Sequence, residues 1–306
     1  MRVAVIGASG FVGRYVVDAL LEAGHRPALL VRAESRNKLQ PSGECRVVEG
    51  EPTSPRAVED LIRGCDAVIF LVGILREFPG RGVTFEALQY EAAALAVDTA
   101  ARLNARRFLL MSANGVHRPG TPYQETKLRA EEYANASGLD VTVFRPSVIF
   151  GDPRDAMEIA TQLCRDMVAP PLPAVSFHTG FRPASGQVRM SPVHVADVAD
   201  AFVRALDDPS TIGRTFELGG PEDLTWTEML RRVAAAAGKS KLILPMPIAL
   251  MRVAATLLDR LPFFPVTRDQ LTMLAEGNCA APDDLRELLG REPRGFTPVE
   301  LAYLRR

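Results

Sequence analysis

The sequence is poor in cysteine and histidine, with only four of each in 306 residues. The four cysteines, Cys45, Cys65, Cys164 and Cys279, lie far apart, and no two of them have the short spacing of zinc ligands. This scarcity argues against a metal site, and the length of the chain argues against a disulfide framework. We therefore predict neither a bound metal nor a disulfide-stapled fold.

Net charge is almost absent as well: at −1 it gives no overall field that would attract nucleic acid or an anionic membrane. The chain contains no run of about 18 uncharged apolar residues, so we expect no membrane span. The first residues, MRVAVIG, already have a strand pattern and lack the features of a signal peptide. The protein is therefore expected to be cytoplasmic.

Continuous apolar runs alternate with helical patterns through the first half of the chain. Because the runs do not alternate polar and apolar residues, they are typical of parallel strands covered by helices on both faces. The pattern predicts an α/β fold, a Rossmann-type doubly wound parallel sheet. The predicted strands are 2–7, 27–32, 45–50, 66–73, 106–113 and 140–150, and the predicted helices are 11–23, 55–63, 84–103 and 122–136.

The alternation loosens after residue 150. We predict a dinucleotide-binding domain over residues 1–150 and a smaller, mostly helical cap or substrate lobe over 151–306, with parts of 188–220 returning to the first domain. The predicted elements of this half are a long Pro-, Gly- and Ser-rich loop at 169–187, helices at 195–206 and 225–238, and a short strand at 214–220.

Two further segments allow more than one interpretation. Residues 242–265 are strongly apolar, and we favour a helix buried in the C-terminal lobe over a surface that contacts a membrane, a quinone or a redox complex. The basic cluster Arg102, Arg106 and Arg107 is expected on a solvated helix end.

Three glycines, Gly7, Gly10 and Gly13, follow the first strand and open the first helix. In this context Gly7 suits a tight turn, Gly10 a close approach of the backbone to a pyrophosphate, and Gly13 close packing of helix on strand. The helix N-terminus adds free N–H groups for the phosphates. A glycine-rich turn without a ligand remains the alternative. The predicted cofactor-binding residues of this turn are Gly7, Ser9, Gly10, Phe11, Val12 and Gly13.

Charged residues after the second strand indicate which dinucleotide binds. Arg32 follows the strand directly and Arg36 comes soon after, with Glu34 between them. A planar guanidinium suits the 2′-phosphate of NADP, so we predict NADP(H) rather than NAD(H). The alternative is that these are solvated loop charges. Glu51 and Gly73, after the third and fourth strands, are expected to line the adenine and nicotinamide sides.

Ser112, Tyr123 and Lys127 form a candidate catalytic set. Ser112 ends the fifth predicted strand, and Tyr123 and Lys127 lie four apart on the next helix, which Thr121 and Gln124 open as a capping box. A nearby ammonium favours the phenolate, so we expect Lys127 to lower the pKa of Tyr123. Ser112 would hold a substrate carbonyl, Tyr123 would transfer the proton, and Lys127 would also contact the nicotinamide ribose. An ordinary amphipathic helix with a packed tyrosine is the alternative.

These motifs together resemble a known family. GASGFVG, MSANG, YQETK, FRPSVIFGD and SPVHVADVADA are similar to motifs of the extended or atypical short-chain dehydrogenase/reductases. FELGGPEDLTWTEMLRRVA, LPMPIAL and PVTRDQLTMLAEGN resemble the group of the nucleotide-binding accessory subunit of respiratory complex I and its free-standing bacterial relatives. The resemblance covers nearly the whole chain.

The resemblance implies a Rossmann-type domain, a bound NADP(H) or NAD(H), and a substrate pocket roofed by the C-terminal lobe. It assigns Tyr123 and Lys127, with Ser112, to the active site, and it implies that Pro146 and Ser147 border the nicotinamide. His194 and Asp197 match the motif that bridges the lobes in the family, where we expect His194 to be structural.

The function remains divided among three hypotheses. The first is an NADP(H)-dependent oxidoreductase acting on a carbonyl or alcohol, with quinone- or isoprenoid-related substrates included. The second is a non-catalytic nucleotide-binding protein that stabilises or senses a redox complex. The third, a nucleotide-sugar epimerase or dehydratase, is disfavoured because Ser112 precedes Tyr123 by only 11 positions, much less than in such epimerases. The expected partners are the dinucleotide and an unknown small molecule, with no nucleic acid.

Overall fold

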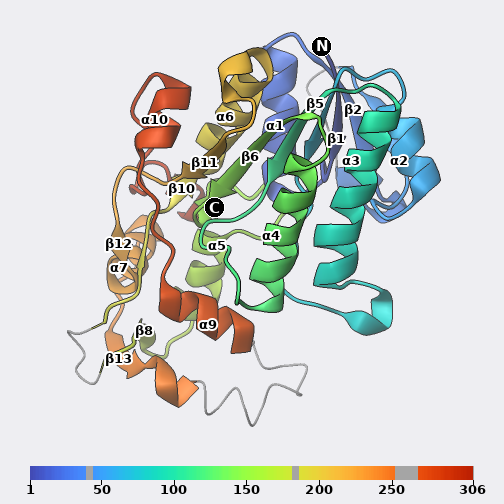
Figure 1. The fold of residues 1–306 in the computed structure, drawn as a ribbon. Coiled ribbons are helices and arrows are strands. Elements are labelled where there is room, and N and C mark those ends of the chain that lie inside the picture. The colour runs from blue at the N-terminus through green and yellow to red at the C-terminus, as the bar shows by residue number, and fades with distance from the viewer. Residues whose placement is uncertain (39–43, 181–185, 252–267, 306) are drawn as a thin grey trace. The chain divides into compact units, whose positions relative to one another are not determined.

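The computed structural model describes residues 1–38, 44–180, 186–251 and 268–305, and the chain divides into two compact units (Figure 1). The first unit comprises Met1–Pro146, Val195–Glu217 and Asp284–Arg291, and the second comprises Ser147–His194, Leu218–Asp283 and Glu292–Arg306.

A seven-stranded parallel sheet forms the centre of the first unit, which confirms the predicted Rossmann-type α/β fold. The strand order is β11-β6-β5-β4-β1-β2-β3. The apolar runs are buried as expected for a sheet covered on both faces; Val3, Ala4, Val5 and Ile6 are all fully buried. The strands are β1 Arg2–Ile6, β2 Arg26–Val31, β3 Arg46–Glu49, β4 Ala67–Phe70, β5 Arg107–Met111, β6 Asp140–Pro146 and β11 Thr215–Leu218.

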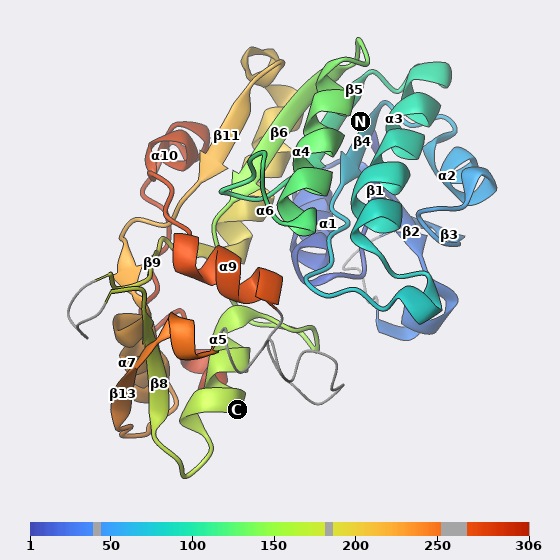
Figure 2. The same ribbon diagram turned by 60° about the horizontal axis from the view of Figure 1, so that its bottom comes forward.

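Helices cover both faces of this sheet (Figures 1 and 2). Neighbouring residues of β6 point to opposite faces: Val143 joins the core under α2, α3 and α4, whereas the ring of Phe144 lies 4.3 Å from that of Phe202 on α6. Helix α6 packs against α1. The helices are α1 Phe11–Glu22, α2 Pro55–Ile62, α3 Ala92–Arg102, α4 Pro122–Asn135, α6 Val195–Asp207 and α10 Asp283–Leu289.

The helix predicted over 84–103 is present, and its first part is a π-helical segment, Glu86–Glu91, that continues as α3. One prediction for the first unit needs correction. Arg107 is buried rather than solvated, because it opens β5 and its guanidinium donates to four acceptors, which are the carbonyl oxygens of Asp140 and Ala205 and the hydroxyls of Thr142 and Thr211. Burial lowers the pKa of Arg107.

The second unit contains short strand pairs and helices around its own apolar core. Phe150, Trp226 and Phe296 belong to this core, and the Phe150 and Phe296 rings meet edge to face with centroids 4.7 Å apart. The strand pairs are β7 Ile149–Phe150 with β10 Val193–His194, β9 Arg189–Met190 with β12 Leu224–Thr225, and β8 Ala174–His178 with β13 Ile243–Pro247. The helices are α5 Ile159–Leu163, α7 Trp226–Ala236 and α9 Arg268–Glu276.

The sheet of β8 and β13 corrects two further predictions. Residues 169–187 are not a continuous loop, because Ala174–His178 form a strand whose partner lies far along the chain. Residues 243–247 are that partner strand rather than part of a helix, and the two prolines of β13 are tolerated because the strand is at an edge. Most of the rest of the predicted helix, 252–265, lies outside the described residues. Among the residues that are described, no helix has the length and apolarity needed to cross a membrane.

Candidate functional site

The glycine turn, residues 7–13, connects β1 to α1 at the carboxyl end of the sheet. Gly7 has a φ of +97°, which L side chains rarely adopt, and its carbonyl oxygen accepts a hydrogen bond of 3.1 Å from the Gly10 N–H. A Cβ at Gly13 would lie 2.2 Å from the Gly7 oxygen and 2.8 Å from backbone atoms of Ala8. Only glycine at position 13 therefore lets the helix start this close to the strand.

The turn also fits the pyrophosphate of a dinucleotide. Gly10 is the N-cap of α1, no side chain caps the helix, and its first turn contains no acidic residue. The N–H groups of Phe11, Val12 and Gly13 have no carbonyl one turn back inside the helix, so they are available to an anion. Ser9 contributes its backbone oxygen to a hydrogen bond of 3.3 Å from Arg14.

The predicted selectivity residues lie after β2 and β3, two strands on the same side of β1. The side chain of Arg32 is 49% exposed and its guanidinium lies 2.9 Å from the Glu34 carboxylate. Arg36 is exposed and lies 3.6 Å from Glu49. Glu51 is exposed just beyond β3. Both arginines are therefore accessible, but each already has a carboxylate beside it.

Lys127 is buried at the carboxyl end of the sheet, with 3% of its surface exposed. From α4 its Nζ donates to the carbonyl oxygens of Val72, after β4, and Met111, at the end of β5, each at 3.0 Å. Gly73 lies against it, because a Cβ there would be 3.4 Å from Nζ. Burial lowers the pKa of Lys127 to about 8, although the charge of Glu131 opposes this change.

Glu131, one turn further along α4, is itself buried and receives a two-pronged hydrogen bond from Arg145, with distances of 3.0 and 2.6 Å. The ion pair with Arg145 therefore fixes a carboxylate one helical turn after Lys127. Glu131 was not among the predicted site residues, although its spacing of four residues from Lys127 places both on one face of the helix.

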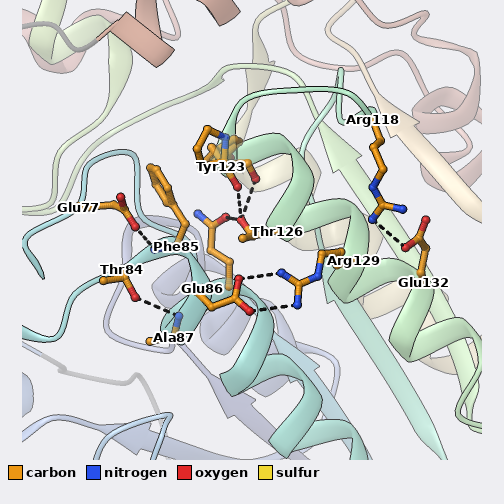
Figure 3. Close-up of polar contacts among 12 residues, drawn as sticks. Glu77, Thr84, Phe85, Glu86, Ala87, Arg118, Tyr123, Thr126, Arg129 and Glu132 are labelled. Atoms are coloured by element: carbon orange, nitrogen blue, oxygen red, sulfur yellow. Dashed lines mark hydrogen bonds and ion pairs between the residues drawn. The ribbon is translucent and has the colours of Figure 1, made fainter.

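Tyr123 precedes Lys127 by one turn and is half-buried. Its ring meets that of Phe85 edge to face, with centroids 5.7 Å apart (Figure 3). Burial raises the pKa of Tyr123 to about 12. The expected lowering of this pKa by Lys127 is therefore wrong for this structure, because desolvation of the phenol dominates.

Ser112 follows β5 directly and is 4% exposed. Its N–H donates to the Phe144 carbonyl oxygen at 2.7 Å, which fixes the backbone. Its Oγ is buried, and within the described part of the chain it has no hydrogen-bond partner. A buried polar atom without a partner costs free energy, so a substrate oxygen at this position would be stabilised.

The loop after Ser112 is tied to the start of α4. The Thr121 hydroxyl accepts from the Gln124 N–H, and the Gln124 side chain accepts from the Thr121 N–H, which confirms the predicted capping box. The amide nitrogen of Gln124 also donates to the Gly115 carbonyl oxygen at 2.9 Å. These bonds hold Ser112, Tyr123 and Lys127 within one corner of the first unit, which we call the Ser–Tyr–Lys corner.

Gln89 is a polar residue of this corner that the sequence analysis missed. It is fully buried on the π-helical segment, where its amide donates to the Ile74 carbonyl oxygen at 2.8 Å and accepts from the Thr126 hydroxyl at 3.0 Å. Nearby, Glu86 accepts two hydrogen bonds from Arg129, at 2.8 and 3.0 Å (Figure 3). These bonds clamp the start of the α3 region to α4. π-helical segments are frequent at functional sites, but hydropathy does not reveal them.

The residues implied at the nicotinamide border are Pro146 and Ser147. Pro146 ends β6 and its carbonyl oxygen accepts from the Asn114 N–H at 3.0 Å. The Ser147 hydroxyl donates to the Asn278 carbonyl oxygen at 2.7 Å within the second unit.

His194 and Asp197 have structural contacts within their own units. In the second unit the His194 ring packs edge to face on Phe150, with centroids 5.1 Å apart, and its Nε2 lies 3.6 Å from Glu300. In the first unit Asp197 is fully buried and accepts from Arg291 at 2.7 Å.

Comparison with known proteins gives a family and several relatives. The family described as NAD(P)H-binding matches residues 7–165. A ceramide reductase from Caulobacter vibrioides is 28% identical over 84% of this chain and 77% of its own length. The mitochondrial NADH dehydrogenase 1 alpha subcomplex subunit 9 of Arabidopsis thaliana is 29% identical over 92% of this chain and 70% of its own.

Solved structures have the same fold. The Thermus thermophilus UDP-glucose 4-epimerase, in complex with NAD, superposes with a TM-score of 0.75 at 20% identity, over 100% of this chain and 99% of the epimerase. A short-chain dehydrogenase/reductase superfamily protein from Agrobacterium tumefaciens with bound NAD gives a TM-score of 0.72 at 19% identity, over 100% and 96% of the two chains. These structures show the same fold, and the family match and the curated relatives confirm the resemblance seen in the motifs.

Proposed function

The chain belongs to the NAD(P)H-binding family, and from this premise we propose that it is an NADP(H)-dependent oxidoreductase that reduces a carbonyl compound. The observation that carries the proposal is the buried Ser112 Oγ without a hydrogen-bond partner among the described residues, in the same corner as Tyr123 and Lys127. A donor left unpaired in a buried site is what a substrate carbonyl oxygen requires.

The proposed division of roles follows from the three side chains. When bound, the nicotinamide supplies the hydride that adds to the carbonyl carbon. The Ser112 hydroxyl donates a hydrogen bond to the carbonyl oxygen, and Tyr123 transfers its phenolic proton to that oxygen as the alcohol forms. Lys127 is an ammonium at pH 7, below its pKa of about 8, and its charge stabilises the phenolate that remains.

The direction of reduction is supported by the state of the phenol. Because burial raises the pKa of Tyr123 to about 12, the side chain holds its proton at neutral pH. A protonated phenol is ready to act as the acid in carbonyl reduction, whereas alcohol oxidation needs a base at the same position. The ceramide reductase relative is named for a reduction, which agrees with this direction.

The proposed preference for NADP(H) over NAD(H) depends on Arg32 and Arg36. Both are exposed after β2, on the side of the glycine turn where the family binds the adenosine ribose. A guanidinium there pairs with a 2′-phosphate, and Glu34 would have to release Arg32 for this contact.

The test compares two tyrosines of the same helix. In Tyr123→Phe, kcat for NADPH-dependent ketone reduction should fall by about 10²- to 10⁴-fold, while the Kd for NADPH stays unchanged. Tyr133→Phe is the matched control, because its hydroxyl bonds to Asp98 at 2.8 Å on the surface. The panel should include aliphatic ketones, quinones and UDP-glucose. Wild-type turnover in Tyr123→Phe would refute the proposed role.

A second candidate is a non-catalytic nucleotide-binding protein within a redox assembly. Relatives that are subunits of NADH dehydrogenase favour it, and so does a phenol held neutral by burial without relief from Lys127. Tight NADPH binding without cofactor oxidation on any member of the panel would support this candidate over the oxidoreductase.

A further inference from the structure

One loop joins the two reactive side chains of the Ser–Tyr–Lys corner. The β4 loop, residues 73–85, starts at Gly73, which lies against the ammonium of Lys127. It ends at Phe85, whose ring packs edge to face on Tyr123 (Figure 3). The loop therefore runs from one reactive side chain to the other and forms part of the wall of the site.

Local hydrogen bonds fix the shape of the β4 loop. Phe78 and Val83 form an antiparallel bridge, in which the Phe78 N–H donates to the Val83 carbonyl oxygen at 2.7 Å. The Glu77 carboxylate accepts from the Phe85 N–H at 2.7 Å, and the Ile74 carbonyl oxygen accepts from Gln89. A loop held at its start, middle and end presents its remaining side chains in a defined arrangement.

The side chains presented in this way are apolar and exposed. Leu75 is 62% and Phe78 is 48% exposed, and the Arg76 guanidinium lies 5.9 Å from the centre of the Phe78 ring. Single exposed apolar residues are ordinary on a protein surface, but two in four consecutive positions beside a reactive centre are unusual. In the described part of the first unit, the other large exposed apolar residues, Met1, Val47, Tyr133 and Ile212, are on other elements.

We propose that Leu75 and Phe78 bind an alkyl chain of the substrate, so that the preferred carbonyl compound is a long-chain aliphatic ketone. The proposal rests on the oxidoreductase function and specifies its substrate class. The Glu77 carboxylate is already used by the Phe85 backbone, and the two arginines of the loop, Arg76 and Arg81, leave Leu75 and Phe78 as its exposed large apolar side chains. An alkyl chain covering both side chains removes apolar surface from water, and its binding strengthens with each methylene added.

The experiment measures kcat/KM for straight-chain methyl ketones of increasing length, with NADPH, and in parallel the Kd of each ketone by calorimetry for the protein loaded with NADP⁺, which cannot reduce it. In the wild type both quantities should improve by about two- to fourfold for each methylene that contacts the loop. In the double variant Leu75→Ser, Phe78→Ser this dependence on chain length should disappear.

Ile212→Ser is the matched control. Ile212 is 38% exposed and precedes β11, so it lies at the amino end of the parallel sheet, opposite the Ser–Tyr–Lys corner. Its removal should leave the chain-length dependence intact.

The outcomes separate the two proposals. If the wild type and the double variant turn over ketones with the same chain-length dependence, binding of the alkyl chain by Leu75 and Phe78 is refuted and the oxidoreductase function is not. If the wild type shows no turnover but its Kd depends on chain length and the double variant loses this dependence, alkyl-chain binding is supported and the oxidoreductase function is refuted. If neither Kd nor kcat/KM of the wild type depends on chain length, alkyl-chain binding is also refuted.

Discussion

The glycine turn and the Ser–Tyr–Lys corner both lie at the carboxyl ends of the strands of one parallel sheet, but they are built differently. The glycine turn consists of backbone: N–H groups, one carbonyl oxygen of Gly7, and the space that Gly13 leaves free. The corner consists of the side chain of Ser112, directly after β5, and of two side chains from α4, and its chemistry depends on how deeply they are buried. The first is determined by local sequence, and the second by the packing of elements distant in sequence.

This difference predicts how each region fails. A substitution in the glycine turn collides with backbone that cannot move aside, so it should damage stability and binding together. A substitution in the corner removes a polar group that is costly to bury, because the Ser112 hydroxyl has no hydrogen-bond partner among the described residues and the Lys127 ammonium is desolvated. It should therefore damage turnover while leaving the fold intact or improving it.

The largest expected effect is that of Gly13→Ala. The new methyl group would lie 2.2 Å from the Gly7 oxygen, so α1 has to move away from β1. We expect the free energy of unfolding to fall by about 3 kcal/mol and NADPH binding to be lost. Urea denaturation and NADPH fluorescence titration measure the two quantities.

Gly80→Ala is the control for this substitution. A Cβ at Gly80 meets nothing within 4 Å, and its φ lies outside the restricted positive range, so the change in stability should stay within about 0.5 kcal/mol. If Gly13→Ala behaves like Gly80→Ala, the close approach of α1 to β1 is not what holds the glycine turn.

The next effect is that of Ser112→Ala, which separates activity from stability. Removing a hydrogen-bond donor to the developing oxyanion should lower kcat by about 10²- to 10³-fold. Because the Ser112 Oγ has no partner among the described residues, its removal should raise the free energy of unfolding by about 1 kcal/mol.

Ser191→Ala is the comparison, and it should change the free energy of unfolding in the opposite direction. Ser191 is fully buried, and its hydroxyl donates to the Asp223 carboxylate and accepts from the Ala280 N–H. The same substitution there should lower stability by about 1–2 kcal/mol. A loss of stability in Ser112→Ala as large as in Ser191→Ala would mean that the Ser112 hydroxyl is satisfied in the folded protein.

The same distinction between local and distant contacts explains which structural features the sequence predicts. The apolar runs predicted the strands of the parallel sheet, and Thr121 with Gln124 predicted the start of α4, because these signals are local. The three glycines predicted the geometry of the turn for the same reason.

The failures all involve partners distant in the chain. Strand β8 looked like a loop because it is stabilised by β13, about seventy residues later, rather than by its own pattern. Arg107 looked solvated because its four acceptors come from β6, α6 and the segment after α6. The direction of the Tyr123 pKa was wrong because the sequence shows the neighbouring charge but not the desolvation.

Because Lys127 is buried, we predict that the free energy of unfolding depends on pH, an effect that the glycine turn does not produce. Its pKa is lowered from an ordinary value of 10.5 to about 8. Between these pH values the unfolded chain keeps a proton that the folded protein has lost, so stability should rise with pH, by up to about 3 kcal/mol. Tyr123, with a pKa raised from 10.0 to about 12, has the opposite effect, and stability should fall between pH 10 and 12.

Urea denaturation of Lys127→Met between pH 7 and 10 tests this. The variant should be more stable than the wild type at pH 7 and should lack the rise above pH 8. Lys239→Met, at an exposed position, should keep the wild-type rise. A wild-type stability that is flat from pH 8 to 10 would show that the ammonium is solvated rather than desolvated.

The smallest expected effect is on the preference between NADPH and NADH, which we assign to the side chains that follow β2. Arg32→Ala should raise the Kd for NADPH about tenfold and change that for NADH less than twofold, because only NADPH has the 2′-phosphate. Glu34→Gln should tighten NADPH binding a few-fold, since the carboxylate 2.9 Å away competes for the same guanidinium. Arg36→Ala should have a smaller effect than Arg32→Ala, because Arg36 lies further from the end of β2, in the 3-10 helix Ala33–Lys38. Equal losses of NADPH and NADH affinity in Arg32→Ala would refute the assignment of cofactor preference to this residue. They would also mean that the backbone alone determines what the glycine turn binds, without discrimination between the two dinucleotides.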